Sequence, residues 1–340
     1  MIWLVIPGAR EGERGAGQWK DLQGIRLVLS ALGADWREFP FDETNVGDLA
    51  ERIGGTEATV VWYYTFWPEA MEALKRRCPR ARIVLRTVNA EALQHWTRAK
   101  KDWRKWRGLP RDVYGFVRLL ARDRRCGRAA DALAGISPWD DDRYWSRLAG
   151  RAKVCHVPYV SPWPSLQPET KPLPWERRED VVLCLAGTRD AIGRAHVAGF
   201  AALAVRPEWS GWRFQLSAGF GDDSRDDLPP VVERLGRIED PWERLCRVKA
   251  VALPSPLGYG CKTTVADALA AGCRVLVHPR QHERLPSDER ELAMPVDPAS
   301  ADDVRRAVAC LSRSPSRLAA AVQQQQMVRA VAEWKRVLEP

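Results

Sequence analysis

The segment 258–272 combines glycines with groups that bind anions, at a predicted junction between a strand and a helix. It reads Gly-Tyr-Gly-Cys-Lys-Thr-Thr-Val-Ala-Asp-Ala-Leu-Ala-Ala-Gly, and an apolar run lies on either side of it. Backbone N–H groups at a helix start attract anions, and Lys262, Thr263 and Thr264 would lie at that start. Asp267 follows one turn later and could accept hydrogen bonds from hydroxyl groups. The pattern therefore indicates a site for a phosphorylated ligand that carries hydroxyls.

Three residues of this segment have predicted local roles. Gly258 and Gly260 would let the backbone approach a ligand closely, because glycine has no side chain. Thr263 is predicted to be the helix N-cap, where its hydroxyl would accept one N–H and leave the others for a phosphate. The ordinary alternative is a strand-to-helix connection that uses glycine only for its turns.

Two arginines lie near a second predicted strand end in the same half of the chain. Arg189 and Arg194 follow the apolar run 181–185 and are five residues apart. The planar guanidinium group suits the oxygens of a diphosphate. Because the carboxyl ends of parallel strands meet at one edge of a sheet, we expect these arginines to lie near segment 258–272. The alternative is a pair of solvated surface arginines.

Length and composition indicate a globular protein of two domains. The chain has 340 residues, of which 45% are hydrophobic. No apolar run approaches the roughly 18 residues that a membrane span needs, and the first residues lack the basic stretch of a signal peptide. The eight cysteines form no C-x-x-C pair, and together with the five histidines they show no metal-ligand spacing. We therefore expect a cytoplasmic protein with reduced thiols and no metal.

Short apolar runs alternate with helical patterns in both halves, which predicts two α/β domains with parallel sheets. The predicted strands are 2–6, 59–63, 82–85, 132–136, 154–157, 181–185, 214–216, 248–253 and 274–277. Six prolines between 158 and 174 interrupt the alternation and predict a linker. The expected organisation is a first domain at 1–160, a linker at 161–178, a second domain at 179–314 and a C-terminal helix at 315–340.

The second half resembles the donor domain of GT-B fold glycosyltransferases, in the retaining, glycogen-synthase-like group 1 family. Arg189 and Arg194 match the family's G-R-x-x-x-x-K-G segment, with Arg in place of Lys. A glycine turn before a helix and a strand that ends in Pro-Ser follow in the family's order, at 235–240 and 253–255. Asp267 begins a match to the family's E-A-L-A-x-G, with Asp in place of Glu.

The resemblance implies two Rossmann-like domains that face a cleft, with the C-terminal helix returning to the first domain. It implies a UDP- or GDP-sugar as donor and no cofactor or metal. The sugar would move to an acceptor held by the first domain, such as a lipid-linked acceptor, a glycan or a natural product. Transfer would retain configuration without a protein nucleophile, through electrostatic stabilisation of the departing diphosphate.

The same resemblance assigns roles to individual residues. It implies Arg189 and Arg194 (or Lys262) at the donor diphosphate, the backbone of Arg237 and Ile238 at the base, and Asp267 at the ribose hydroxyls. Gly260, Thr263 and Thr264 would bind the donor by their place in the loop. The family often has an acid just before the glycine-rich loop, and residues 256–259 contain none. A catalytically inactive nucleotide-sugar-binding or assembly protein is therefore an alternative.

The first half contributes candidates for the acceptor side of such a site. Gly15 and Gly17 belong to a glycine-rich loop after the first predicted strand, and this loop faces the cleft in the family. His95 and Asn89 follow the predicted strand 82–85, where similar enzymes bind the acceptor, and they are the catalytic candidates. The alternatives are ordinary turn glycines and surface polar residues.

Most of the positive charge is concentrated in one basic segment. Residues 98–125 contain eleven Lys and Arg and three Asp, a net +8, in a chain whose net charge is +9. Aromatic and basic residues are interleaved near its start, at Trp103, Arg104, Lys105, Trp106 and Arg107. An anionic membrane surface or lipid-linked acceptor would attract such a segment, placing the protein at the inner face of the membrane. A nucleic acid would also do so, giving a nucleic-acid-directed glycosyltransferase, and a solvated helix face is the ordinary alternative.

Overall fold

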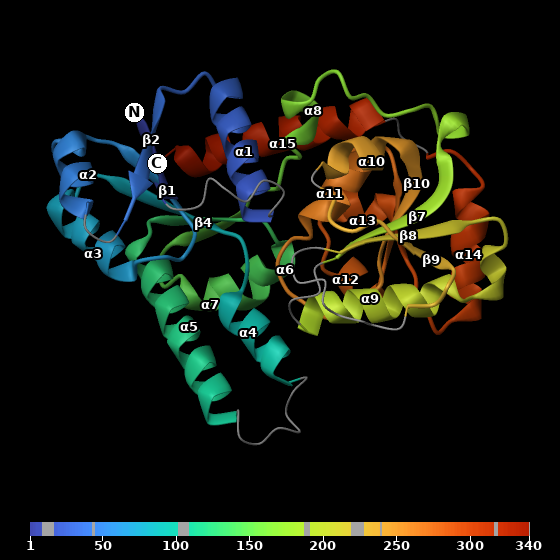
Figure 1. Cartoon of the computed structure of the whole chain (residues 1–340). Coiled ribbons are helices and arrows are strands. Elements are labelled where there is room, and N and C mark those ends of the chain that lie inside the picture. Colours follow the sequence, from blue (N-terminus) through green and yellow to red (C-terminus); the bar gives the residue numbers. More distant parts are fainter. Residues whose placement is uncertain are drawn as a thin grey trace. The chain divides into compact units, whose positions relative to one another are not determined.

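A computed structural model describes residues 1–8, 17–42, 45–100 (backbone only at 98–100), 109–186, 191–218, 228–238, 240–315 and 319–339. It divides into two compact units, which are described separately. Unit 1 comprises Met1–Val160, Tyr259–Cys261 and Gln326–Pro340, and unit 2 comprises Ser161–Gly258 and Lys262–Gln325. Figure 1 shows the helices and strands of both units.

Unit 1 is built on a sheet of six parallel strands in the order β2-β1-β3-β4-β5-β6. The strands are β1 (Ile2–Pro7), β2 (Trp36–Phe41), β3 (Thr59–Tyr63), β4 (Arg82–Thr87), β5 (Ala132–Gly135) and β6 (Lys153–His156). The central strands are nearly continuous apolar runs because helices cover both faces of the sheet. The sheet confirms the predicted α/β class, and β2 is a strand that the apolar pattern did not indicate.

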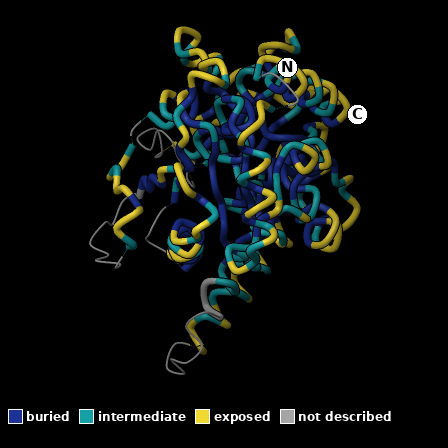
Figure 2. The backbone as a smooth tube through the Cα atoms, turned by 90° about the vertical axis from the view of Figure 1, so that its right-hand side faces the viewer, coloured by how far each residue is buried: buried dark blue, intermediate teal, exposed yellow. Residues whose placement is uncertain are grey.

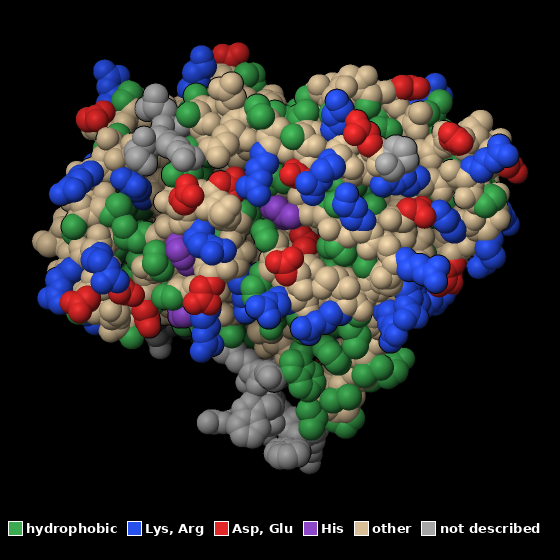
Figure 3. All heavy atoms as spheres, turned by 180° about the vertical axis from the view of Figure 1, so that it is seen from behind, with side chains coloured by type: hydrophobic (Ala, Val, Ile, Leu, Met, Phe, Trp, Pro, Cys, Tyr) green, Lys and Arg blue, Asp and Glu red, His purple; other side chains and the backbone are tan. Residues whose placement is uncertain are grey.

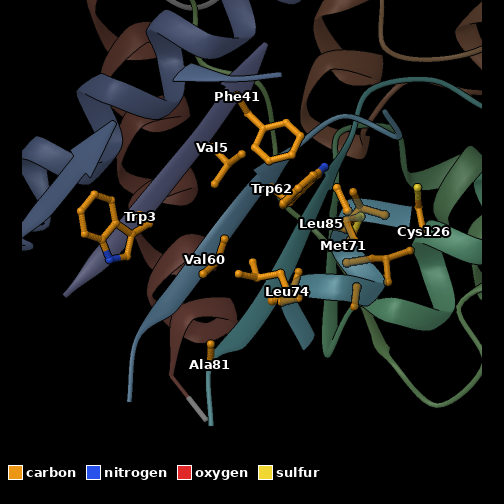
Figure 4. Packing of buried hydrophobic residues seen from close by; sticks show 14 of the residues in the cluster. Trp3, Val5, Phe41, Val60, Trp62, Met71, Leu74, Ala81, Leu85 and Cys126 are labelled. Carbon is orange, nitrogen blue, oxygen red and sulfur yellow. The ribbon is translucent and has the colours of Figure 1, made fainter. Parts of the chain in front are cut away.

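Helices of unit 1 form a buried layer on each face of this sheet. They are α1 (Gly17–Ala31), α2 (Val46–Ile53), α3 (Pro68–Arg77), α4 (Glu91–Lys100), α5 (Leu109–Ala129), the short α6 (Pro138–Asp140), η2 (Asp141–Trp145) and α7 (Ser146–Leu148). One face packs Trp62 and Leu85 against Met71 and Leu74 of α3 (Figure 4). The other face packs against α1 and α15 (Ala319–Leu338), with Trp334 among its buried residues. The predicted return of the C-terminal helix to the first domain is therefore confirmed.

A buried ion pair ties this second face together. Arg86 of β4 donates to both carboxylate oxygens of Asp21 on α1, at 2.6 and 3.0 Å, and each side chain is 1% exposed. The Arg86 guanidinium also donates to the carbonyl of Val157 at 2.8 Å and lies 5.6 Å from the ring centroid of Trp334. Because a buried arginine needs all its donors satisfied, this residue fixes the positions of α1, β4 and α15.

Asp123 is a second buried acid of unit 1, on the inner side of α5. Its side chain is fully buried and accepts a hydrogen bond from the Tyr144 hydroxyl at 2.7 Å. Burial raises the pKa of Asp123 from 3.8 to about 6, an effect that the Tyr144 hydrogen bond and the neighbouring Arg122 only partly offset. The folded chain therefore holds a proton here that the unfolded chain releases at lower pH.

We expect Asp123→Asn to flatten the pH dependence of stability. Between about pH 4 and 6 the unfolded chain loses this proton while the folded chain retains it, so the free energy of unfolding falls by about 3 kcal/mol as pH rises through this window. The asparagine side chain would not titrate and would still accept from Tyr144. Urea unfolding of both proteins across this range measures the difference, and parallel profiles would show that Asp123 is not protonated in the folded state.

Unit 2 is built on a second sheet of six parallel strands, in the order β12-β11-β10-β7-β8-β9. The strands are β7 (Glu179–Ala186), β8 (Arg213–Ala218), β9 (Val232–Arg234), β10 (Val248–Leu253), β11 (Arg274–Val277) and β12 (Ala293–Pro295). Its helices are α8 (Trp163–Leu166), η3 (Trp175–Arg177), α9 (Ala191–Ala204), η4 (Pro207–Trp209), α10 (Pro241–Arg247), α11 (Thr263–Ala270), α12 (Pro279–His282), α13 (Ser287–Leu292) and α14 (Ala301–Leu311). The second α/β sheet is thus also confirmed.

The proline-rich segment 161–178 packs into unit 2. Arg178 at its end is buried and donates to the carbonyls of Ala271 at 2.6 Å and Leu173 at 2.8 Å. Earlier in the segment, the Trp242 indole donates to the carbonyl of Thr170 at 3.0 Å. These bonds anchor the segment beside α10 and α11.

Two further findings concern the whole described chain. All eight cysteines are free thiols, and burial raises the pKa of Cys184 and Cys273 to about 12. No helix in the described ranges is long and apolar enough to cross a membrane.

Candidate functional site

The strand order of unit 2 brings its two predicted motifs to the same place. Strands β8 and β9 lie on one side of β7, whereas β10 to β12 lie on the other, so the connections diverge between β7 and β10. Ligands of open α/β sheets bind beyond the carboxyl ends of the strands at such a switch point. The chain leaves β7 at Ala186 and enters α9 at Ala191, and it leaves β10 at Leu253 and enters α11 at Thr263. Both motifs therefore belong to the loops at this edge.

Gly258 lies where the two loops of unit 2 meet. Its φ is +107°, and a Cβ at this position would lie 2.8 Å from Lys262 Nζ and 3.4 Å from Ile192 of α9. Lys262 therefore places its ammonium group close to the start of α9, which also carries Arg194, an exposed residue. Arg189 lies outside the described residues.

Polar side chains hold the rest of this loop in place. Buried Ser255 accepts from the N–H of Leu257 at 3.1 Å. Gln281 of α12 donates to the carbonyl of Leu257 at 2.7 Å, and both Gln281 and Arg284 donate to the carbonyl of Gly258. A loop held by so many bonds is preorganised and does not have to be ordered by a ligand. Sequence reasoning missed Gln281 and Arg284, which follow the next strand along the chain.

The start of α11 differs from the prediction in one respect. Thr263 is the first residue of the helix and Lys262 occupies the cap position, where its side chain makes no capping hydrogen bond. The prediction of Thr263 as N-cap is therefore wrong, because the loop delivers the chain into the helix one residue earlier. The Lys262 ammonium cannot accept a hydrogen bond, so the side chain at the cap position does not compete with an anion for the N–H groups of this turn, of which that of Val265 bonds to the Lys262 carbonyl at 2.7 Å. Thr264 is half-buried, and Asp267, one turn later, is 1% exposed.

The turn at Gly236–Ile238 is held at the carboxyl end of β8. Gly236 has a φ of +66°. The Ser217 hydroxyl donates to the carbonyl of Gly236 at 3.0 Å and accepts from the N–H of Ile238 at 3.2 Å. Arg237 is exposed and Ile238 is half-buried. The predicted base-contacting backbone is therefore a fixed turn, pinned by a serine that sequence reasoning missed.

The residues Tyr259–Cys261 belong to unit 1. The N–H of Tyr259 donates to Gln94 Oε1 at 2.9 Å, and that of Gly260 donates to buried Asp140 Oδ2 at 2.8 Å. Gly260 has a φ of +77°, and a Cβ there would lie 2.0 Å from Asn89 Oδ1. The close neighbour that requires glycine at 260 is thus Asn89. Asp140 and Gln94, which hold this segment, are residues that the sequence did not indicate.

The structure separates the two catalytic candidates. Asn89 contacts Gly260 and donates to Glu91 Oε1 at 3.0 Å. Glu91 also accepts from the Tyr64 hydroxyl, and burial together with the Glu91 charge raises the pKa of Tyr64 well above its usual value. His95, in contrast, lies with Nε2 3.1 Å from the carbonyl of Asp112 on α5. Its ring thus packs between α4 and α5.

Unit 1 has a pocket of about 550 Å³ at the switch point of its own sheet, where β1 lies between β2 and β3. Its walls come from the ends of these three strands and are Pro7, Gly8, Pro40, Phe41, Asp42, Asn45, Phe66 and Trp67. Phe41 and Trp67 lie 5.1 Å apart and Phe66 and Trp67 lie 5.5 Å apart, measured between ring centroids. The pocket therefore offers aromatic faces beside an exposed carboxylate.

The aromatic wall of this pocket is held in a strained backbone. Tyr64 and Trp67 have φ angles of +71° and +52°, a region that bulky side chains rarely adopt. The Trp62 indole donates to the carbonyl of Phe66 at 3.2 Å, and the N–H of Tyr64 donates to the carbonyl of Arg86 at 3.0 Å. Strain of this kind persists where surrounding bonds impose it, and it is concentrated at functional sites. The run of aromatics at 62–67 is the sequence signal that could have indicated this pocket.

For the remaining predicted residues, the structure gives no contact that bears on the site. Gly17 is the first residue of α1, whereas Gly15 lies outside the described residues. Trp103, Arg104, Lys105, Trp106 and Arg107 also lie outside them. No cluster of metal-ligating side chains occurs within the described ranges.

Comparison with solved structures shows strong likeness over the whole chain. The Anabaena protein HepE in complex with UDP matches with a TM-score of 0.59 and 13% identity, over 99% of this chain and 98% of that one. Sucrose-phosphate synthase from Thermosynechococcus elongatus matches with a TM-score of 0.55 and 14% identity, over 99% and 96%. The trehalose-6-phosphate synthase OtsA matches with a TM-score of 0.55 and 11% identity, over 99% and 96%.

Sequence comparisons add no closer relative. No family model matches the chain, and no curated protein matches it. The structural likeness and the two parallel sheets agree with the fold that the motifs of the second half predict. The chain therefore has the GT-B fold of glycosyltransferases, two Rossmann-like domains with a C-terminal helix that returns to the first.

Proposed function

We propose that this protein is a glycosyltransferase that moves a sugar from a nucleoside diphosphate sugar to an acceptor, with retention of configuration. The observation that carries the proposal is the switch point of unit 2, where Lys262, the uncapped start of α11 and the start of α9 converge at Gly258. These groups would neutralise the diphosphate as it departs, without a metal. Arg194, and Arg189 by its spacing, would add charge at the same edge.

The donor would lie across the carboxyl edge of unit 2. Its ribose hydroxyls would donate to the Asp267 carboxylate. Its base would meet the backbone of the Gly236–Ile238 turn that Ser217 holds. UDP is the nucleotide we propose, because HepE has been solved with UDP and with UDP-glucose. Retention needs no protein nucleophile in this scheme if the acceptor hydroxyl bonds to the anomeric carbon on the same face from which the diphosphate leaves, with the departing diphosphate, stabilised by its binding site, taking up the hydroxyl proton.

A thermal-shift panel of nucleoside diphosphates and nucleotide sugars tests the proposal. A ligand present at about a hundred times its Kd should raise the Tm by about 4 °C. We expect UDP and one UDP-sugar to do so, with release of UDP once an acceptor is supplied. A shift without UDP release under any acceptor would favour the inactive binder, and the absence of any shift would refute the donor site.

We infer that the pocket of unit 1 receives the acceptor. Phe66 and Trp67 offer flat faces to the C–H groups of a sugar ring or to another apolar ring. Asp42 is exposed at the rim, where its carboxylate could accept from an acceptor hydroxyl. The combination suits a molecule with one apolar face and several hydroxyls.

Asp42→Ala should therefore act on the acceptor alone. We expect its KM for the acceptor to rise about tenfold, the loss of one hydrogen bond to a charged group, while UDP affinity stays unchanged. Asp48→Ala is the matched control, because Asp48 is an exposed acid on the neighbouring α2 that does not line the pocket. Equal acceptor kinetics in both variants would show that the acceptor binds elsewhere.

A further inference from the structure

Exposed apolar side chains gather on the first turns of α5. Leu109, Val113, Tyr114 and Val117 are 39%, 41%, 67% and 54% exposed, and they are four of the ten large hydrophobic residues exposed among the described residues. Single exposed apolar residues are normal, whereas a cluster marks a contact surface. Figure 3 shows hydrophobic side chains gathered at this lower edge of the molecule.

The spacing of these residues makes them one continuous stripe. Leu109, Val113 and Val117 recur every four residues, so they follow one side of α5 over about 12 Å. In Figure 1, α4 and α5 project side by side away from the sheet, and Figure 2 shows exposed and half-buried residues along them. The stripe therefore lies on one of a projecting pair of helices.

The side of α5 that faces α4, next to the stripe, is already occupied. The ring of Phe116 lies 5.4 Å from that of Trp96 on α4, and a Cβ on Gly115 would lie 2.4 Å from His95 Nε2. These contacts fix α5 against α4 in one orientation. The stripe is thus held outward by packing and cannot turn inward to join the core.

Basic residues accompany the stripe. The helix contains six arginines and two aspartates. Arg111, Arg118 and Arg124 are exposed, and none forms an ion pair with a described residue, whereas Arg125 pairs with Glu69 and Glu72. Apolar side chains next to long basic ones are typical of helices that lie at the surface of an anionic bilayer, where arginine reaches the headgroups.

Two other partners fit this surface less well. Single-stranded nucleic acid binds through stacking on aromatic rings, whereas three of the four exposed residues are Leu or Val. A second copy of the chain would bring the same arginines together, and like charges oppose association. Of these three partners, only an anionic lipid surface accounts for both the aliphatic stripe and the positive charge.

We propose that the first turns of α5 dock this protein on an anionic membrane, with the Leu109–Val117 stripe among the acyl chains and Arg111 and Arg118 at the headgroups. The inference does not rest on the proposed transferase activity, because docking is measured without donor or acceptor. It would bring a membrane-bound acceptor within reach of unit 1.

Vesicle sedimentation of the full chain tests the proposal. One set of vesicles is phosphatidylcholine alone, and the other contains phosphatidylglycerol as one third of its lipid. We expect binding to the anionic vesicles only. Val113→Ser with Val117→Ser should weaken it about tenfold, and Arg118→Gln about fivefold. Val328→Ser is the matched control, because Val328 is 62% exposed on α15 of unit 1, and it should bind like the parent chain.

The outcomes separate the alternatives. Absence of vesicle binding, or equal binding by the double serine variant and the parent chain, would overturn the proposal. Salt-sensitive binding of a single-stranded oligonucleotide without vesicle binding would assign the surface to nucleic acid, and serine-sensitive dimerisation in sedimentation velocity would assign it to a second copy. The thermal shift with UDP is measured for every variant. An unchanged shift shows that the donor site is intact, so that a loss of vesicle binding is assigned to α5.

Discussion

Asp267→Ala is expected to weaken UDP binding about a hundredfold, the largest effect of a single substitution on the donor site. A carboxylate can accept from both ribose hydroxyls, and each bond to a charged acceptor contributes about 1.5–3 kcal/mol. Asp267 is 1% exposed one turn into α11, so its carboxylate is held in one position. Titration calorimetry with UDP measures the loss.

The specific contact can be separated from general disruption of the helix. Asp267→Asn keeps the shape and one acceptor, so it should lose about tenfold and leave the Tm nearly unchanged. If Asp267 contacts the ribose, then removing the 2′-hydroxyl with 2′-deoxy-UDP should cost little more in the alanine variant, because the partner is already absent. Additive losses from the substitution and from the deoxy ligand would show that Asp267 does not bind the ribose.

Gly260→Ala should have the largest effect on stability, about 3 kcal/mol of unfolding free energy. The added Cβ would lie 2.0 Å from Asn89 Oδ1 and 3.1 Å from the carbonyl of Val88, at a φ of +77°. Relief of the clash would pull the N–H of Gly260 away from Asp140, whose buried carboxylate accepts it at 2.8 Å. Urea denaturation of the chain measures the loss.

Two companion variants isolate the cause. Gly33→Ala has a similar φ of +61° with nothing within 4 Å of the added Cβ, so it should cost only the backbone strain, about 1 kcal/mol. Asn89→Ala combined with Gly260→Ala should recover part of the loss by removing the clashing oxygen. Equal costs for the two glycine variants, with no recovery, would mean that segment Tyr259–Cys261 does not pack on Asn89.

The strands that sequence reasoning missed all lie at the edges of the sheets. Central strands such as β3 and β10 are nearly continuous apolar runs, because helices cover both of their faces. Strand β2 reads Trp-Arg-Glu-Phe-Pro-Phe, and its charges and proline are tolerated because it has only one neighbour. Strands β9 and β12 are edges of three residues each, too short to show a period.

The candidate site was predictable where it depends on residues of one loop. It was unpredictable where it depends on contacts between residues far apart in the sequence. Residues 254–272 show their glycines, lysine and acid in one stretch, so the candidate anion site is visible in the sequence. The partners of Tyr259 and Gly260 lie 165 and 120 residues away, and a single sequence has no signal for such contacts. The positive φ of Tyr64 and Trp67 was equally hidden, because tertiary bonds impose a conformation that these residue types disfavour.

A crystal structure of the protein soaked with UDP tests the central claim most directly. The account predicts that the diphosphate lies at the start of α11, with Lys262 Nζ on its oxygens, and that the ribose hydroxyls face Asp267. It also predicts that the uracil lies against the Gly236–Ile238 turn. Well-ordered UDP bound anywhere else on the chain, including the aromatic pocket of unit 1, would contradict the assignment of unit 2 as the donor domain.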